Sequence, residues 1–245
     1  MVRVLLIRGM LVGVLAAMPT FAVAKTLGES QIGHAIAFES ARDAAEGVHT
    51  TELVSRTVQS TLGLFTGLVV FGAAVGGLFA LAFAGAQGRC GNLGARGTAA
   101  LVACAGFVGV YVLPDIKYPA NPPSIGNPDT IGERTSLYVT MMLISLAVVV
   151  GGCVTARRLM ARFGTWNAAL LAVAGSLVII GLAYYLLPRV HETPQGFPAD
   201  VLWRFRIASL AVQMTLWAAI GLLFGALTDR AVRSAPSAQE RKVLL

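Results

Sequence analysis

The chain alternates long apolar stretches with shorter polar ones, and these stretches are too long for the core of an ordinary soluble protein. A bilayer core about 30 Å thick requires about 20 apolar helical residues to cross it. Five uncharged windows reach or approach this length, and the chain start, interrupted by Arg8, is a sixth candidate. The pattern predicts an all-α, polytopic membrane helix bundle with about six transmembrane helices, at residues 4–24, 63–86, 97–114, 135–156, 163–188 and 207–228.

The polar segments between these helices predict the topology. With six helices in a single integral membrane domain over residues 1–245, the outside loops are 25–62, 115–134 and 189–206, and both termini are cytoplasmic. Basic residues concentrate on the cytoplasmic side of membrane proteins. The predicted inside segments hold only the acids Asp229 and Glu240, against these basic residues: Arg3, Arg8, Arg89, Arg96, Arg157, Arg158, Arg162, Arg230, Arg233, Arg241 and Lys242.

The first apolar segment has two interpretations. It is either a retained transmembrane helix or a secretory signal, because Arg3 and Arg8, an apolar run and then Ala22-Val23-Ala24 precede Lys25. Small residues in this arrangement are typical of a cleavage site. Both interpretations place Lys25 on the far side of the membrane, so the predicted topology holds for either.

Composition supports lipid as the solvent. Hydrophobic residues make up 56% of the chain and charged residues only 13%, about half the charged share of a typical globular protein. The formal net charge of +7 follows from the basic inside segments, so no nucleic-acid partner is needed to explain it. We predict a multi-pass protein of the cell (plasma) membrane.

Repeats and small residues indicate how the helices pack. The runs AALVACAG (99–106) and AALLAVAG (168–175) predict either three repeated hairpins or a chance similarity between Ala/Leu-rich helices. Small residues four apart allow helix backbones to approach closely in lipid. Such pairs occur at Gly9/Gly13, Gly63/Gly67, Gly72/Gly76 and Gly221/Gly225, and their concentration in the second helix predicts a central position for it.

The sequence predicts no enzyme and no permanently bound cofactor. It contains no P-loop, HExxH or GxSxG pattern, and no histidine–carboxylate pair lies within the predicted membrane helices. Cys90, Cys104 and Cys153 lie outside the predicted outside loops, so no disulfide is expected there.

The first outside loop carries the principal candidate metal ligands. Glu39, Asp43 and Glu46 recur at spacings of four and three, so on a helix they share one face. His49 follows Glu46 by three residues. Carboxylates combined with imidazole suit divalent metals such as cobalt, nickel or zinc. The alternative interpretation is a solvated amphipathic helix that lies on the membrane.

Further candidates are scattered over the polar segments. His34, His191, Asp115 and Asp129 are possible additional metal ligands, and Asp129 alternatively caps a helix. Gln59 and Gln213 lie near the outer ends of two predicted helices, each in a VQxTL pentad. They are candidates either for a polar pathway or for ordinary hydrogen bonds between helices.

Longer motifs resemble one family. KYPANPPSIGNPDTIGERT (117–135) and GFPADVLWRFRIASL (196–210) resemble the CbtA family of probable cobalt transporter subunits, and AIAFESARDAAEG (35–47) with ELVSRTVQSTLGLFTG (52–67) resembles its actinobacterial branch. The resemblance implies a membrane protein linked to cobalt supply for cobalamin synthesis. It also implies a small partner, a CbtB-like protein with one helix and a histidine-bearing tail.

Two functions follow as expectations. In the first, the chain is a membrane subunit that captures Co(II), its substrate, at the acidic and histidine-bearing outside loops. In the second, it is a non-transporting interaction subunit that docks a metal-handling partner. The expected partners are therefore the lipid bilayer, a divalent metal ion and the small histidine-tailed membrane subunit, without nucleic acid.

Overall fold

Helices make up nearly all of the regular structure. The computed structural model describes residues 2–47, 54–89, 91–123, 125–190 and 192–234, and no strand occurs among them. The elements in chain order are α1 (Val2–Val23), the π-helix η1 (Ala24–Gly28), α2 (Glu29–Glu46), α3 (Arg56–Val58), the π-helix η2 (Gln59–Gly63), α4 (Leu64–Ala86), α5 (Ala95–Gly106), the π-helix η3 (Phe107–Val112), α6 (Leu113–Lys117), the 3₁₀ turn η4 (Pro128–Thr130), α7 (Ile131–Leu186) and α8 (Ala199–Arg233).

Several of these elements join end to end into helices that are long and apolar enough to cross a membrane. Five such helices lie in the described residues: Val2–Glu46, Arg56–Ala86, Ala95–Lys117, Ile131–Leu186 and Ala199–Arg233. The prediction of an all-α, multi-span membrane protein is therefore confirmed.

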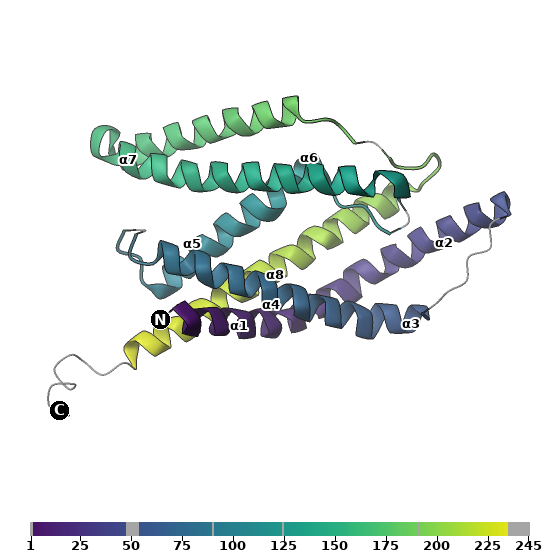
Figure 1. Cartoon of the computed structure of the whole chain (residues 1–245), viewed down its shortest axis with the longest axis horizontal. Helices are drawn as coiled ribbons and strands as arrows, with labels where there is room; N and C mark the ends of the chain where they lie inside the picture. Colours follow the sequence, from purple (N-terminus) through teal and green to yellow (C-terminus); the bar gives the residue numbers. More distant parts are fainter. Residues whose placement is uncertain (1, 48–53, 90, 124, 191, 235–245) are drawn as a thin grey trace. The chain divides into compact units, whose positions relative to one another are not determined.

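The predicted helices 135–156 and 163–188 both lie in α7. Its backbone leaves the helical region at Gly164, where φ is 72° and ψ is 167°, and Figure 1 shows the two arms of α7 folding back alongside each other at this bend. Residues 157–162, which lie between these two predicted helices, are helical as well. They are rich in Arg, Leu, Met and Ala, which are good helix formers, so the chain turns only where glycine permits a positive φ.

The segment 25–62, predicted as an outside loop, is also largely helical in its described part. α1 continues through η1 into α2, because no proline interrupts residues 20–46. The helix ends at Gly47, whose φ of 71° provides the left-handed conformation that commonly terminates helices. Glu39, Asp43 and Glu46 therefore lie on a helix, which is the condition under which their spacing predicts a shared face.

The chain divides into two compact units. Unit 1 comprises Met1–Thr20, Gly63–Cys104 and Thr215–Leu245, and unit 2 comprises Phe21–Leu62 and Ala105–Met214. The prediction of a single membrane domain stays a prediction.

Close approach of helix backbones holds unit 1 together. A Cβ atom added to Gly13 would lie 1.8 Å from the carbonyl oxygen of Gly72, and one added to Gly9 would lie 2.2 Å from that of Gly76. The predicted pairs Gly9/Gly13 and Gly72/Gly76 therefore pack against each other, whereas nothing lies within 4 Å of a Cβ at Gly67 of the predicted pair Gly63/Gly67. Phe224 of α8 completes the core, with ring centroids 5.3 Å from Phe79 and 5.0 Å from Phe83.

Unit 2 contains two apolar clusters. Met141, Ile180 and Ala183 bring the two arms of α7 together. Ala35 of α2 packs with Ile125, Phe197 and Val201 in the second cluster. Large apolar side chains remain exposed on the second arm of α7, including Trp166 at 75% and Tyr185 at 84%. Such a surface suits contact with lipid.

Candidate functional site

Unit 2 contains a cavity of about 760 Å³. This volume is typical of sites for small organic molecules and is far larger than one metal ion needs. Residues of η3, α6, the segment after α6, the start of α7, the segment before α8 and α8 itself line it. The polar side chains among them are Tyr111, Asp115, Lys117, Tyr118, Asn121, Arg134, Thr135, Tyr138, Glu192, Thr193 and Arg206.

Asp115 fixes the chain where it leaves the membrane-spanning helix. Its Oδ1 atom accepts a hydrogen bond of 3.0 Å from the backbone N–H of Ala120. One turn earlier, in the π-helix η3, the Tyr111 hydroxyl lies 3.2 Å from the Ser209 hydroxyl of α8. π-Helical turns occur frequently at functional sites. The cavity wall is thus built on a helix end that two polar side chains hold in place.

An ion pair joins the start of α7 to the segment between α7 and α8 beside the cavity. The Arg134 Nε atom lies 3.1 Å from Glu192 Oε2. Glu192 also accepts hydrogen bonds from the Thr130 hydroxyl at 2.5 Å and from the Asn127 N–H at 3.1 Å. The Thr130 hydrogen bond is the largest of the effects that lower the pKa of Glu192 below its ordinary value, and the Asn127 N–H and the Arg134 charge add to it. The carboxylate therefore stays ionised and holds both segments.

Gly126 makes space for this ion pair. Its φ is +112°, and a Cβ atom there would lie 2.3 Å from Nη1 of Arg134. The Arg134 guanidinium also donates to the carbonyl oxygens of Ile125 at 3.5 Å and Asn127 at 3.3 Å. The sequence IGNPDTIGER thus forms a compact turn around the arginine that follows it.

Two more basic side chains tie the segment after α6 to neighbouring elements. Lys117 Nζ donates to the carbonyl oxygens of Tyr184 at 2.7 Å and Leu187 at 2.9 Å, where the end of α7 leaves carbonyls without helical partners. Arg206 donates from Nε to the Ala120 carbonyl at 3.3 Å and from Nη2 to Asn121 Oδ1 at 3.1 Å. Both cations lie in the cavity wall.

The acid-bearing helix α2 is anchored to the same region. Phe38 packs edge-on against Phe197, with ring centroids 5.1 Å apart. Ala35, which is buried, contacts the cluster that includes Ile125, and Ile125 lines the cavity. The helix that carries Glu39 and Asp43 therefore rests on a segment of the cavity wall.

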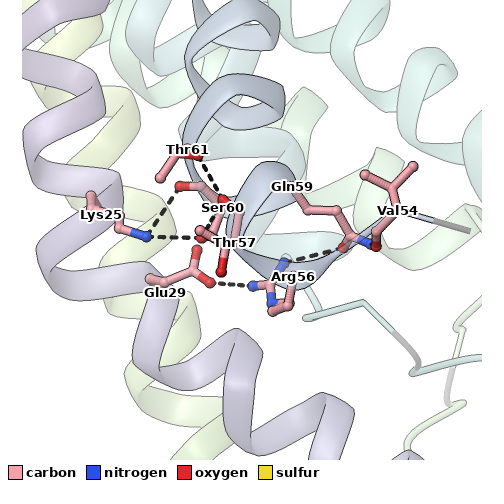
Figure 2. Close-up of polar contacts among 8 residues, drawn as sticks. All are labelled: Lys25, Glu29, Val54, Arg56, Thr57, Gln59, Ser60 and Thr61. Atoms are coloured by element: carbon pink, nitrogen blue, oxygen red, sulfur yellow. Dashed lines mark hydrogen bonds and ion pairs between the residues drawn. The ribbon is translucent and has the colours of Figure 1, made fainter. Parts of the chain in front are cut away.

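A separate polar cluster lies at η1, where α1 continues into α2. Figure 2 shows Lys25 of η1 reaching Ser60 of η2, with Nζ 2.9 Å from the hydroxyl and 3.2 Å from the carbonyl oxygen. Arg56 pairs with Glu29 of α2 beside this contact. An ammonium group at a π-helical carbonyl supplies a donor where the backbone pattern is irregular. This cluster links η1 and α2 to α3 and η2.

The structure places most of the predicted metal ligands without gathering them. Glu39 and Asp43 are half-buried on α2, whereas Glu46 is exposed and lies 3.7 Å from Arg42. Within the described residues, no three His, Cys, Asp or Glu side chains come close enough to hold a metal ion together. The predicted metal set therefore stays a prediction.

The remaining candidates differ in their surroundings. Asp115 lies in the cavity wall, while His34 and Asp129 are exposed. The backbone N–H of Asp129 donates to Asn127 Oδ1 at 3.0 Å, within the turn before α7. His49 and His191 fall outside the described residues.

The two predicted pathway glutamines lie on η2 and α8. Gln59 is exposed at the start of η2 and donates to the Val54 carbonyl at 2.8 Å. Gln213 is half-buried on α8. Their assignment to a pathway stays a prediction.

Sequence reasoning missed the basic side of the cavity. None of Arg134, Arg206 and Glu192 was among the candidate site residues. The available signal was that prolines precede an arginine in both connecting segments, at 117–135 and at 189–206. It marks both segments as structured, although it does not show that they contact each other.

The fold and the cavity together describe a multi-pass helical membrane protein with a polar site among its connecting segments. The family model described as "Probable cobalt transporter subunit (CbtA)" matches residues 2–229. The chain therefore belongs to the CbtA family of probable cobalt transporter subunits. No curated protein and no solved structure matches the chain.

Proposed function

We propose that the protein is the membrane subunit of a cobalt uptake system, and that it captures Co(II) from outside the cell for cobalamin synthesis. Membership of the CbtA family supports the transport of cobalt. The observation that carries the capture role is the placement of α2, an acidic helix packed through Ala35 and Phe38 onto the segment that lines the cavity. Cations attracted to its carboxylates are concentrated beside this cavity.

The proposed capture group comprises Glu39, Asp43, Glu46 and His49. Carboxylate and imidazole donors suit Co(II) and related ions. Glu39 and Asp43 are one helical turn apart and partly accessible, so a metal ion can engage them in succession. The second group of proposed ligands consists of His34, His191, Asp115 and Asp129, and Gln59 and Gln213 are the proposed pathway residues.

Topology is part of the proposal. Both termini lie in the cytoplasm, and the capture group faces the outside, because this arrangement places most basic residues inside. Reporter fusions at the C-terminus test it. Activity of the reporter on the outer side of the membrane would exclude the capture role together with the topology.

Uptake of radiolabelled cobalt tests the function directly. Cells that carry the chain should accumulate more cobalt than cells without it, and the double variant Glu39→Gln/Asp43→Asn should raise the KM for cobalt with little change in maximal rate. Glu133→Gln is the control, because Glu133 is also an acid on a helix, is exposed and lies outside the proposed group. Equal KM values in the double variant and the control would refute capture by α2.

Binding measurements separate capture from later steps. Isothermal calorimetry with cobalt chloride on detergent-purified protein should show weaker binding in Glu39→Ala and in His49→Ala. Unchanged affinity in both variants would contradict their assignment as ligands.

One observation favours a second function. The described residues hold no cluster of three metal-binding side chains, which suits a subunit that docks a partner rather than one that binds the metal alone. Such a partner would be a small single-helix, histidine-tailed membrane protein. Co-purification with it, combined with no cobalt flux through the chain alone in liposomes, would support this alternative over the first proposal.

A further inference from the structure

We propose that the cavity of unit 2 binds a small organic anion with two or more carboxylate groups, either free or as its Co(II) chelate. The size and charge of the cavity support the binding of the anion. Only the link between the anion and cobalt rests on the proposed function.

The charge of the cavity wall argues for an anion. Its ionisable acidic and basic side chains are three cations, Lys117, Arg134 and Arg206, and two carboxylates, Asp115 and Glu192. A wall with excess positive charge repels a bare divalent cation and attracts a negatively charged ligand, so the anion site and the assignment of Asp115 as a Co(II) ligand are alternatives at this position.

The bonding of the two carboxylates strengthens this argument. Both oxygens of Glu192 already accept hydrogen bonds, from the Asn127 N–H at 3.1 Å and the Thr130 hydroxyl at 2.5 Å, and Oε2 also faces Arg134. Asp115 Oδ1 is engaged by the Ala120 N–H at 3.0 Å. A metal ion would have to compete with these donors for its ligands.

The cations, in contrast, keep donor capacity. A guanidinium group has five N–H donors, and Arg206 uses two of its nitrogens to hold Ala120 and Asn121. An ammonium group has three donors, and Lys117 directs its amino group to the carbonyls of Tyr184 and Leu187. These contacts also fix the position of both side chains, which reduces the entropy lost when a ligand binds.

Size and shape define the ligand class further. A volume of about 760 Å³ exceeds what an inorganic anion fills, and lies in the range of sites for small organic molecules. The planar guanidinium fork of Arg206 matches a carboxylate in two parallel hydrogen bonds. Tyr111, Tyr118 and Tyr138 supply aromatic and hydroxyl surface beside it. Polycarboxylates chelate divalent metals, so one ligand of this class can accompany cobalt.

Calorimetry on the full-length protein in nanodiscs tests the proposal with defined probes. Citrate and tricarballylate, a tricarboxylate that lacks the hydroxyl of citrate, should both bind, whereas inorganic phosphate should bind at least tenfold more weakly. If the chelate is the natural form, Co(II)–citrate should bind more tightly than citrate; equal or weaker binding identifies the free anion as the ligand. Failure of both tricarboxylates and of the Co(II)–citrate chelate to bind would overturn the proposal.

Matched variants locate the binding to the cavity. Arg206→Gln should weaken citrate binding about tenfold or more, because a charge-assisted contact is lost. Arg204→Gln removes an exposed arginine of the same helix that does not line the cavity, and it should change the affinity less than twofold. Equal effects of the two substitutions would place the anion elsewhere and refute the site.

A second pair of variants tests whether the ligand is negatively charged and leaves the arginine contacts unchanged. Thr193 is exposed in the cavity wall. Thr193→Asp should weaken citrate binding about fivefold by repulsion, whereas Thr193→Asn should leave it unchanged. Tighter binding of citrate to the aspartate variant would contradict the proposal.

These results are distinguishable from those that test the proposed function. Cobalt uptake without any binding of tricarboxylates, alone or as the Co(II) chelate, would overturn the anion site and leave cobalt transport intact. Binding of citrate without any cobalt uptake would support the anion site and overturn the proposed cobalt transport.

Discussion

Unit 1 and unit 2 are held together by different kinds of contact. In unit 1, α1 and α4 approach so closely that glycine backbones touch, and phenylalanine rings of α4 and α8 fill the remaining space. In unit 2, ion pairs and hydrogen bonds join connecting segments around a cavity. The helix contacts of unit 1 therefore depend chiefly on the size of its side chains, whereas unit 2 combines two apolar clusters with a polar network that depends on charge and on hydrogen-bond geometry. Substitutions can test this contrast.

The largest effect is expected from Gly13→Leu in unit 1. A Cβ atom at this position would lie 1.8 Å from the Gly72 carbonyl oxygen, so the helices must separate, at a cost of about 3 kcal/mol or more. Thermal unfolding in detergent, followed by circular dichroism, measures the loss. Gly67→Leu is the control, because nothing lies within 4 Å of a Cβ there. Equal loss in both variants would show that the α1–α4 contact does not stabilise unit 1.

Gly126→Ala should have the next largest effect, in unit 2. The substitution forces alanine into a φ of +112° and brings its Cβ within 2.3 Å of Arg134 Nη1. A strained backbone of this kind costs about 1–3 kcal/mol. Gly196→Ala has a positive φ of 80° with nothing within 4 Å, so it reports the backbone strain alone. The difference in melting temperature between the two variants gives the contribution of the arginine contact, and no difference would contradict it.

Glu192→Gln should lower the stability of unit 2 in a pH-dependent manner. Because the pKa of Glu192 in the folded protein is lowered from its ordinary value of 4.5, its stabilisation is fully present above pH 4.5 and is lost as the pH falls through the folded pKa. The wild type should therefore lose stability on acidification, and the glutamine variant should lose less over the same range.

Melting temperatures measured at neutral pH and below pH 4.5 provide this comparison. Glu133→Gln serves as a control, because Glu133 is exposed in the first turn of α7. Parallel pH profiles for the wild type and Glu192→Gln would exclude the ion pair with Arg134 as a stabilising contact.

The smallest effect is expected from Arg42→Ala on α2. Its partner Glu46 is 3.7 Å away, and both side chains are largely exposed, so the pair contributes less than about 1 kcal/mol. A chemical-denaturation midpoint close to that of the wild type would show that isolated ion pairs do not stabilise unit 2. A large loss would mean that charge alone, without a network of hydrogen bonds, is sufficient.

The sequence predicted the parts of the molecule that depend on local pattern. Uncharged apolar stretches identified the spans, and glycines spaced four apart marked the surfaces where α1 and α4 meet. The acidic face of α2 followed from the spacing of Glu39, Asp43 and Glu46. These features depend on residues within one or two helical turns of each other, and such spacing can be read directly from a sequence.

The position of the bend in α7 and the pairing of distant residues were not predicted. The bend of α7 falls at Gly164 rather than in the basic segment before it, because only the glycine adopts a positive φ. The pairing of Arg134 with Glu192 joins segments on either side of α7. A single sequence shows that each residue is polar, but it does not show which of many possible partners lies opposite.

The hydrogen bond from Arg8 to Thr228, at 3.2 Å, joins residues of α1 and α8 that are 220 positions apart in the chain. During translation α1 enters the membrane long before α8 exists, and its glycine surface meets α4 while the later contacts are still missing. Unit 1 is thus completed only when the ribosome has finished α8. A nascent chain arrested before Thr215 would lack this hydrogen bond and the contacts of Phe224 with α4, so the packing of unit 1 requires segments that are synthesised at widely separated times.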